Sequence, residues 1–136
     1  MAYLLDTNVC IALINGASDR VRKKFSNVAS AGQAAWVSSV SLYELWYGVA
    51  KSARVTANAL RVTTFLAGPA RVLEFAEQDA QMAGRIRSDL ERMGRPIGAY
   101  DLLIAGQAIS RGFKLVTANA REFARVKDLD WEDWER

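Results

Sequence analysis

Oxygen-bearing side chains recur where short apolar segments of the chain end or where helical patterns begin. These positions are Asp6, Glu44, Asp101, Asn119 and Glu122. If they share one site, carboxylate and amide oxygens surround it, and hard cations such as Mg²⁺ take oxygen ligands. A divalent cation lowers the pKa of a bound water and stabilises charge on a phosphoryl group. Together these positions predict metal-dependent hydrolysis of a phosphodiester.

Two rare residue types narrow the chemistry further. The 136-residue sequence has no histidine and one cysteine, Cys10. This composition excludes Ser-His-Asp and Cys-His catalysis, a zinc site built from histidine or cysteine, and an intramolecular disulfide. Carboxylates must therefore carry any hydrolytic chemistry.

Each acid also has a local structural explanation. Asp6 suits the N-cap of a first helix, and Ser41 with Glu44 matches the S-x-x-E capping box. Asp101 would complement the macrodipole of its helix, and Glu122 would lie in the first turn of the last helical segment. Taken singly, each of these explanations is favoured over a catalytic role.

Taken together, the acids favour a shared site. Asp101 begins a helix that is almost entirely apolar, and an uncompensated charge buried beside it would be costly. Carboxylates gathered at one edge would also repel one another and raise their pKa values. A divalent cation resolves both problems.

The elements that must position these residues alternate between short apolar strands and helices. We expect strands over Ala2–Leu5, Ala35–Ser38, Val72–Phe75, Lys114–Thr117 and Leu129–Trp134. We expect helices over 9–15, 19–31, from Ser41 to about 49, and over Ala53–Leu66, Asp79–Met93 and Asp101–Ser110. This alternation predicts one α/β domain over residues 1–136, with a mainly parallel sheet. Active sites in such sheets lie outside the carboxyl ends of the strands, where these acids fall.

Charge and hydropathy bear on the setting of the protein. Residues 1–127 carry a formal charge of +7, and residues 128–136 carry −4. A basic body attracts a polyanion, although charge alone favours simple solubility. No apolar run reaches 18 residues, and no basic region precedes Asp6, so we expect a cytoplasmic protein without a membrane segment.

Four ordered sequence blocks resemble one known family. They are LLDTN at 4–8, SSVSLYELWYGV at 38–49, IGAYDLLIAGQA at 97–108 and KLVTANAREF at 114–123. These blocks are similar to the successive motifs of PIN-domain proteins, above all the VapC-type toxin ribonucleases of bacterial toxin–antitoxin pairs. The resemblance implies a three-layer α/β/α domain that cuts RNA with Mg²⁺ or Mn²⁺. It also implies a VapB-type antitoxin as inhibitor, a homodimer, and toxin–antitoxin hetero-oligomers.

The resemblance also assigns roles to individual residues. Asp6, Glu44 and Asp101 match three acidic positions of the family, so we expect them to be catalytic and to hold the metal ion. Glu44 would ligate the ion or orient the attacking water. The polar residues that match supporting positions are Thr7, Asn8 and Thr117.

The fourth acidic position departs from the family pattern. Many PIN domains have an aspartate where this chain has Asn119, and Glu122 could supply the missing carboxylate from one turn further on. The alternative reading is a catalytically weakened PIN fold that acts as an RNA- or protein-binding scaffold. Asn119 favours that alternative, whereas the retention of the other three acids opposes it.

Aromatic side chains cluster around the second block. They are Trp36, Tyr43, Trp46 and Tyr47. We interpret them as core or partner-contact residues, with stacking on nucleic-acid bases as the less favoured reading.

Overall fold

A five-stranded parallel sheet forms the centre of the computed structural model, which describes residues 1–136. Its strands are β1 (Ala2–Leu5), β2 (Ala34–Ser38), β3 (Arg71–Leu73), β4 (Lys114–Val116) and β5 (Trp131–Glu132). The strand order is β3-β2-β1-β4-β5, and every neighbouring pair is parallel. The predicted α/β class with a parallel sheet is confirmed.

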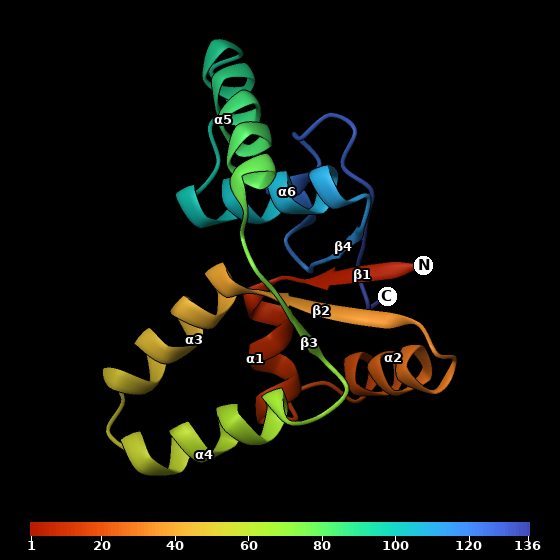
Figure 1. The fold of residues 1–136 in the computed structure, drawn as a ribbon, viewed down its shortest axis with the longest axis vertical. Coiled ribbons are helices and arrows are strands. Elements are labelled where there is room, and N and C mark those ends of the chain that lie inside the picture. The colour runs from red at the N-terminus through yellow and green to blue at the C-terminus, as the bar shows by residue number, and fades with distance from the viewer.

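Seven helices cover the two faces of this sheet (Figure 1). One face carries α1 (Thr7–Asn15), α2 (Asp19–Ser30), α3 (Ser39–Ala50) and α4 (Val55–Leu66). The other carries α5 (Glu77–Arg92), α6 (Ala99–Arg111) and α7 (Ala120–Phe123). Successive strand residues point to opposite faces, so Leu5 joins the first core and Leu4 the second. The three-layer α/β/α arrangement is therefore confirmed.

The strand order reverses at the centre of the sheet. From β1 the chain passes to β2 on one side, whereas β4 pairs with β1 on the other side. In open α/β sheets, ligands bind outside the carboxyl ends of the strands at such a switch point. Asp6 directly follows β1, and Thr117 directly follows β4. The topology thus brings together two segments that are about a hundred residues apart in sequence.

The predicted start of α3 is wrong, and so is the capping box. The helix begins at Ser39, and the side chain of Ser38 caps it by accepting a hydrogen bond from the Val40 amide at 3.0 Å. Ser41 and Glu44 are consequently the third and sixth residues of the helix, and the Glu44 carboxylate accepts the Thr7 hydroxyl instead of closing a capping box. Glu44 is left free to face the sheet edge.

The start of α5 also differs from the prediction. The helix begins at Glu77, two residues before Asp79, because the Asp79 carboxylate accepts the Ala76 amide at 2.7 Å from within the first turn. Smaller differences affect element ends: β3 stops at Leu73, β4 at Val116, and α4 starts at Val55. The last strand covers only 131–132 because only those residues pair with β4.

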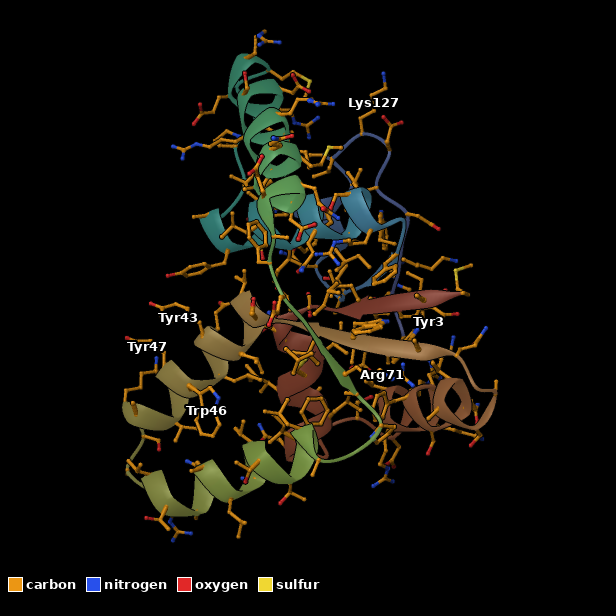
Figure 2. All side chains as sticks on the ribbon, viewed as in Figure 1. Tyr3, Tyr43, Trp46, Tyr47, Arg71 and Lys127 are labelled. Carbon is orange, nitrogen blue, oxygen red and sulfur yellow. The ribbon has the colours of Figure 1, made fainter.

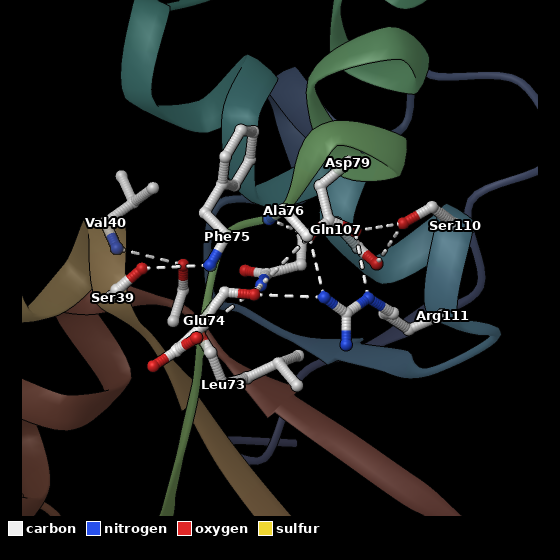
Figure 3. Close-up of polar contacts among 11 residues, drawn as sticks. Ser39, Val40, Leu73, Glu74, Phe75, Ala76, Asp79, Gln107, Ser110 and Arg111 are labelled. Atoms are coloured by element: carbon white, nitrogen blue, oxygen red, sulfur yellow. Dashed lines mark hydrogen bonds and ion pairs between the residues drawn. The ribbon is translucent and has the colours of Figure 1, made fainter.

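Helix α6 is held firmly in place between α5 and the sheet. At Gly106 an added Cβ would lie 2.7 Å from the Ala83 backbone nitrogen, so the two helices pack with almost no side chain between them. Near the other end of α6, Arg111 forms an ion pair with the buried carboxylate of Asp79 at 3.0 Å (Figure 3). The Gln107 amide also donates to the Glu74 carbonyl at 3.1 Å. These contacts fix the helix whose first turn carries Asp101.

None of the helices combines the length and apolar character that crossing a bilayer demands.

Candidate active site

Asp6 lies at the centre of the carboxyl edge of the sheet and is only 4% exposed. It caps α1, accepting the Val9 amide at 2.8 Å on one carboxylate oxygen. The Thr117 hydroxyl donates to the other oxygen at 2.5 Å, which joins β1 to β4. Burial raises the pKa of Asp6 above its ordinary value, although the hydrogen bonds from Thr117 and Val9 work against this. The N-cap prediction for Asp6 is confirmed.

Glu44 reaches the same edge from the second turn of α3. The Thr7 hydroxyl donates to its carboxylate at 2.6 Å and lies 2.8 Å from the hydroxyl of Ser41. Ser41 is fully buried and faces the same side of α3 as Glu44. Thr7 thus fixes the Glu44 carboxylate, and Ser41 fixes Thr7.

Asp101 stands in the first turn of α6, close to the other acids. Its pKa is raised to about 7, first by burial, then by the adjacent Glu122 carboxyl, and then by the charges of Asp6 and Glu44. The Asp101 carboxyl therefore lies close enough to those of Glu122, Asp6 and Glu44 to interact with each of them. Residues from four parts of the chain therefore converge on one place.

Asn119 and Glu122 form the side of the site next to β4. The Asn119 side-chain amide donates to the Glu122 carboxylate at 3.2 Å. The Asn119 backbone amide donates to the Thr117 hydroxyl at 2.9 Å, which in turn donates to Asp6. An amide at position 119 therefore orients Glu122, an arrangement that a carboxylate at 119 would not provide.

The charge at this edge is not neutralised by the protein. None of the four acids takes part in an ion pair with lysine or arginine. As the side chains stand, no three acidic groups are placed to hold one ion among themselves. Mg²⁺ usually keeps several waters and binds through one or two carboxylates, so this open arrangement fits a hydrated cation.

The three supporting residues predicted from the sequence are not all part of the site. Thr7 and Thr117 join the hydrogen-bond network, whereas Asn8 is exposed and its side chain takes no part in it. Sequence reasoning missed Ser41 as a support because its S-x-x-E spacing to Glu44 also fits a helix cap. The i, i+3 spacing of Ser41 and Glu44 was the signal, since such residues share a helix face.

The aromatic residues of the second block are not core residues as a group. Tyr43 and Tyr47 are 56% and 57% exposed, so the core interpretation is wrong for them. Trp46 is also exposed, and only Trp36 is largely covered, stacked on Phe113 with ring centroids 6.0 Å apart. Tyr43 and Tyr47 project outward from α3, and Trp46 projects toward α4 (Figure 2).

Comparison with known proteins points to one family. Residues 3–129 match the PIN domain. The chain is 40% identical to the tRNA(fMet)-specific endonuclease VapC of Salmonella typhimurium, with 98% of each chain covered. It is 37% identical to ribonuclease VapC2 of Rickettsia felis over the full length of both. The structure of VapBC2 from Rickettsia felis, bound to a DNA fragment from their promoter, superposes with a TM-score of 0.92. That chain is 36% identical, and the match covers 98% of this chain and 99% of that one.

These matches extend over nearly all of the chain and include the strands and helices that carry the acids. Their identities lie well above the level at which only a fold is shared. The chain therefore belongs to the PIN-domain family, in its VapC group of ribonucleases.

Proposed function

We propose that this protein is the toxin of a toxin–antitoxin pair and hydrolyses RNA through the acid cluster formed by Asp6, Glu44, Asp101 and Glu122. The observation that carries the proposal is the convergence of four carboxyl groups at the switch point with no basic side chain to neutralise them. PIN-domain nucleases generally depend on a divalent metal, which would supply the missing positive charge. We place this activity in the cytoplasm, where its RNA substrate is found.

Asp6, Asp101 and Glu44 would hold the cation, either Mg²⁺ or Mn²⁺, in part directly and in part through its bound waters. When bound, such an ion offsets charge on the phosphate and acidifies a water. Glu44, fixed by Thr7, would orient the attacking water and accept its proton as general base. Water would add to phosphorus in line with the leaving ribose oxygen, and the bond to that oxygen would break. Glu122, oriented by Asn119, would serve as the fourth carboxylate.

The test compares cleavage of total bacterial RNA by the antitoxin-free protein and by single variants, with Mg²⁺ or Mn²⁺ and then with EDTA. Asp6→Ala and Asp101→Asn should abolish cleavage while circular dichroism shows an intact fold. Glu91→Gln is the matched control, since Glu91 is an exposed acid of α5 that pairs with Arg87 and takes no part in the hydrogen bonds of the site. Full activity in either site variant would contradict the assignment. No cleavage by folded, metal-loaded wild type would instead favour the scaffold alternative.

A groove beside the acid cluster supports an antitoxin as the partner of this protein. An apolar groove of about 230 Å³ opens beside Glu44, between α1, α3 and α4. Its lining includes Ile11, Ile14 and Leu45, together with the charged side chains of Glu44 and Arg61. Because the related structure from Rickettsia felis is a VapBC complex, we propose that a VapB-type antitoxin binds here. Bound next to Glu44, it would block access of RNA to the acids.

The groove can be tested with a purified VapB-type antitoxin encoded beside the gene. Ile11 is 40% exposed at the groove, and Ile11→Asp should weaken the complex in a titration followed by calorimetry. Leu60→Asp is the control, because Leu60 is exposed on α4 but does not line the groove. Equal affinity of Ile11→Asp and wild type would place the antitoxin elsewhere.

A further inference from the structure

Three exposed tyrosines form a continuous surface beside the acid cluster. Tyr43 and Tyr47 lie on α3, and Tyr100 lies in the first turn of α6 with 43% of its surface exposed. We call these three residues the tyrosine surface. The rings of Tyr43 and Tyr100 meet across the two helices with centroids 5.7 Å apart, and their hydroxyls are 3.4 Å apart.

The two touching tyrosines are each next in sequence to a proposed catalytic acid. Tyr43 immediately precedes Glu44, and Tyr100 immediately precedes Asp101. The helices that deliver two of the acids therefore also deliver the two touching tyrosines.

The surface continues along α3 and ends at a cation. Tyr43, Tyr47 and Lys51 are spaced four residues apart and so follow one another along the same helix face. At a rise of about 1.5 Å per residue, they span roughly 12 Å. The Lys51 amine lies over the Tyr47 ring, 4.9 Å from its centroid. Lys51 has no carboxylate partner, so its charge is available to an anion.

The chemistry of this surface matches single-stranded nucleic acid. Proteins that bind unpaired strands combine aromatic rings, on which bases stack, with basic side chains that contact phosphates.

We propose that the tyrosine surface stacks unpaired RNA bases next to the acid cluster, and that Lys51 contacts the RNA backbone. The inference rests on the proposed ribonuclease function, and it makes Tyr43, Tyr47 and Tyr100 determinants of substrate binding. Stacking requires bases that are not paired, so the surface selects single-stranded or looped RNA near the cut.

The test measures binding of an end-labelled, single-stranded RNA of mixed sequence by fluorescence anisotropy. All proteins carry Asp101→Asn to prevent cleavage. Tyr43→Ser and Tyr47→Ser should each weaken binding about tenfold, whereas Tyr43→Phe and Tyr47→Phe should keep wild-type affinity because the ring remains. Leu60→Ser, which removes an exposed apolar side chain from α4, is the control and should bind normally. Lys51→Met should reduce the slope of log affinity against log salt by about 0.7, as expected for one phosphate contact with a single strand.

The outcomes separate this inference from the proposed function. If wild type cleaves RNA but both serine variants bind it normally, the stacking role is refuted while the ribonuclease stands. If the serine variants change the mass measured by light scattering and leave RNA affinity intact, the surface is a contact between copies of the chain, and the inference is again refuted. Absence of metal-dependent cleavage by wild type would refute the proposed function itself.

Discussion

Asp79 and Arg111 connect the start of α5 to the last turn of α6, and their ion pair should contribute strongly to stability. The Asp79 side chain is fully buried, whereas that of Arg111 is 21% exposed. Arg111 donates to both carboxylate oxygens, at 3.1 and 3.0 Å, and Ser110 and the Ala76 amide also donate to this carboxylate (Figure 3). Burial alone would raise the pKa of Asp79, but these hydrogen bonds outweigh it and hold the pKa below its ordinary value.

The two halves of this pair should differ in their cost when removed. Breaking a buried ion pair from one side costs about 3–5 kcal/mol, because the other charge is left without a partner. Arg111→Met leaves an anion with no route to water, so its cost should lie near the upper end, about 5 kcal/mol. Asp79→Asn leaves a cation that is already partly exposed and can turn to solvent, so its cost should be about 3 kcal/mol.

The pH dependence follows from the sign of the pKa shift. The folded pKa of Asp79 is lower than the unfolded value of about 3.9, so the pair stabilises fully above that pH. Its contribution is lost as the pH falls through the folded pKa. In Arg111→Met, burial without the guanidinium raises the pKa of Asp79. Lowering the pH then protonates this carboxylate, which removes the free-energy cost of a buried charge without a partner. The destabilisation caused by Arg111→Met should therefore shrink as the pH falls from about 7 to about 4.

Urea denaturation followed by circular dichroism measures these free energies. The double variant Asp79→Asn/Arg111→Met should be less destabilised than the two single costs combined, since each change removes the same interaction. Arg87→Met is the control, because the pair of Arg87 with Glu91 is exposed and is worth less than about 1 kcal/mol. Additive single costs, or a cost of Arg111→Met that does not change with pH, would refute the reasoning.

Three further perturbations test the site and the helix packing. Asp101→Asn should raise the melting temperature of the metal-free protein, because it removes a carboxylate crowded by Glu122, and a lower melting temperature would contradict that crowding. Asn119→Asp should lower the melting temperature in EDTA and enlarge the increase on adding Mg²⁺, because it replaces a donor to Glu122 with another carboxylate. Equal increases in wild type and variant, measured by scanning fluorimetry, would mean that position 119 does not affect the ion. Gly106→Ala should cost about 2 kcal/mol in urea denaturation because its Cβ would meet the backbone of α5 at 2.7 Å. Gly84→Ala, with open space around it, should stabilise the protein slightly, and equal effects of the two changes would disprove the close packing.

The sequence predicted those features that depend on local patterns. The apolar run at Ala2–Leu5, followed by Asp6, predicted a buried strand and a helix cap, and both are confirmed. Helix starts were predicted less well. Ser41 and Asp79 each match an N-cap, but Ser38 and Ala76 hold those positions. At α3, a local signal cannot distinguish Ser38 from Ser41, because both serines are able to cap. At α5, the N-cap Ala76 has no capping side chain, and Asp79 bonds back to its amide from within the first turn.

The acids themselves were also found from sequence, because the ends of strands and the starts of helices mark the carboxyl edge of a parallel sheet. Their order in the chain says nothing about which of them touch. Only the placement of β4 beside β1 brings the Thr117 hydroxyl to Asp6, and only the packing of α6 brings Asp101 against Glu122. The raised pKa of Asp101 is therefore a property of the tertiary structure.

The exposed aromatic residues also show what local sequence determines and what the tertiary structure decides. The four-residue spacing of Tyr43 and Tyr47 puts both on one face of α3, and the periodicity of an α-helix is sufficient for that. Whether that face is buried or exposed depends on which neighbouring elements cover it. Tyr100, which contacts Tyr43, lies 57 residues further along the chain. Residue types and spacing thus determined the chemistry available to this protein. The strand order and the packing of α3 against α6 decided where those side chains meet, because distant segments come into contact only once the sheet has formed and the helices have packed on it.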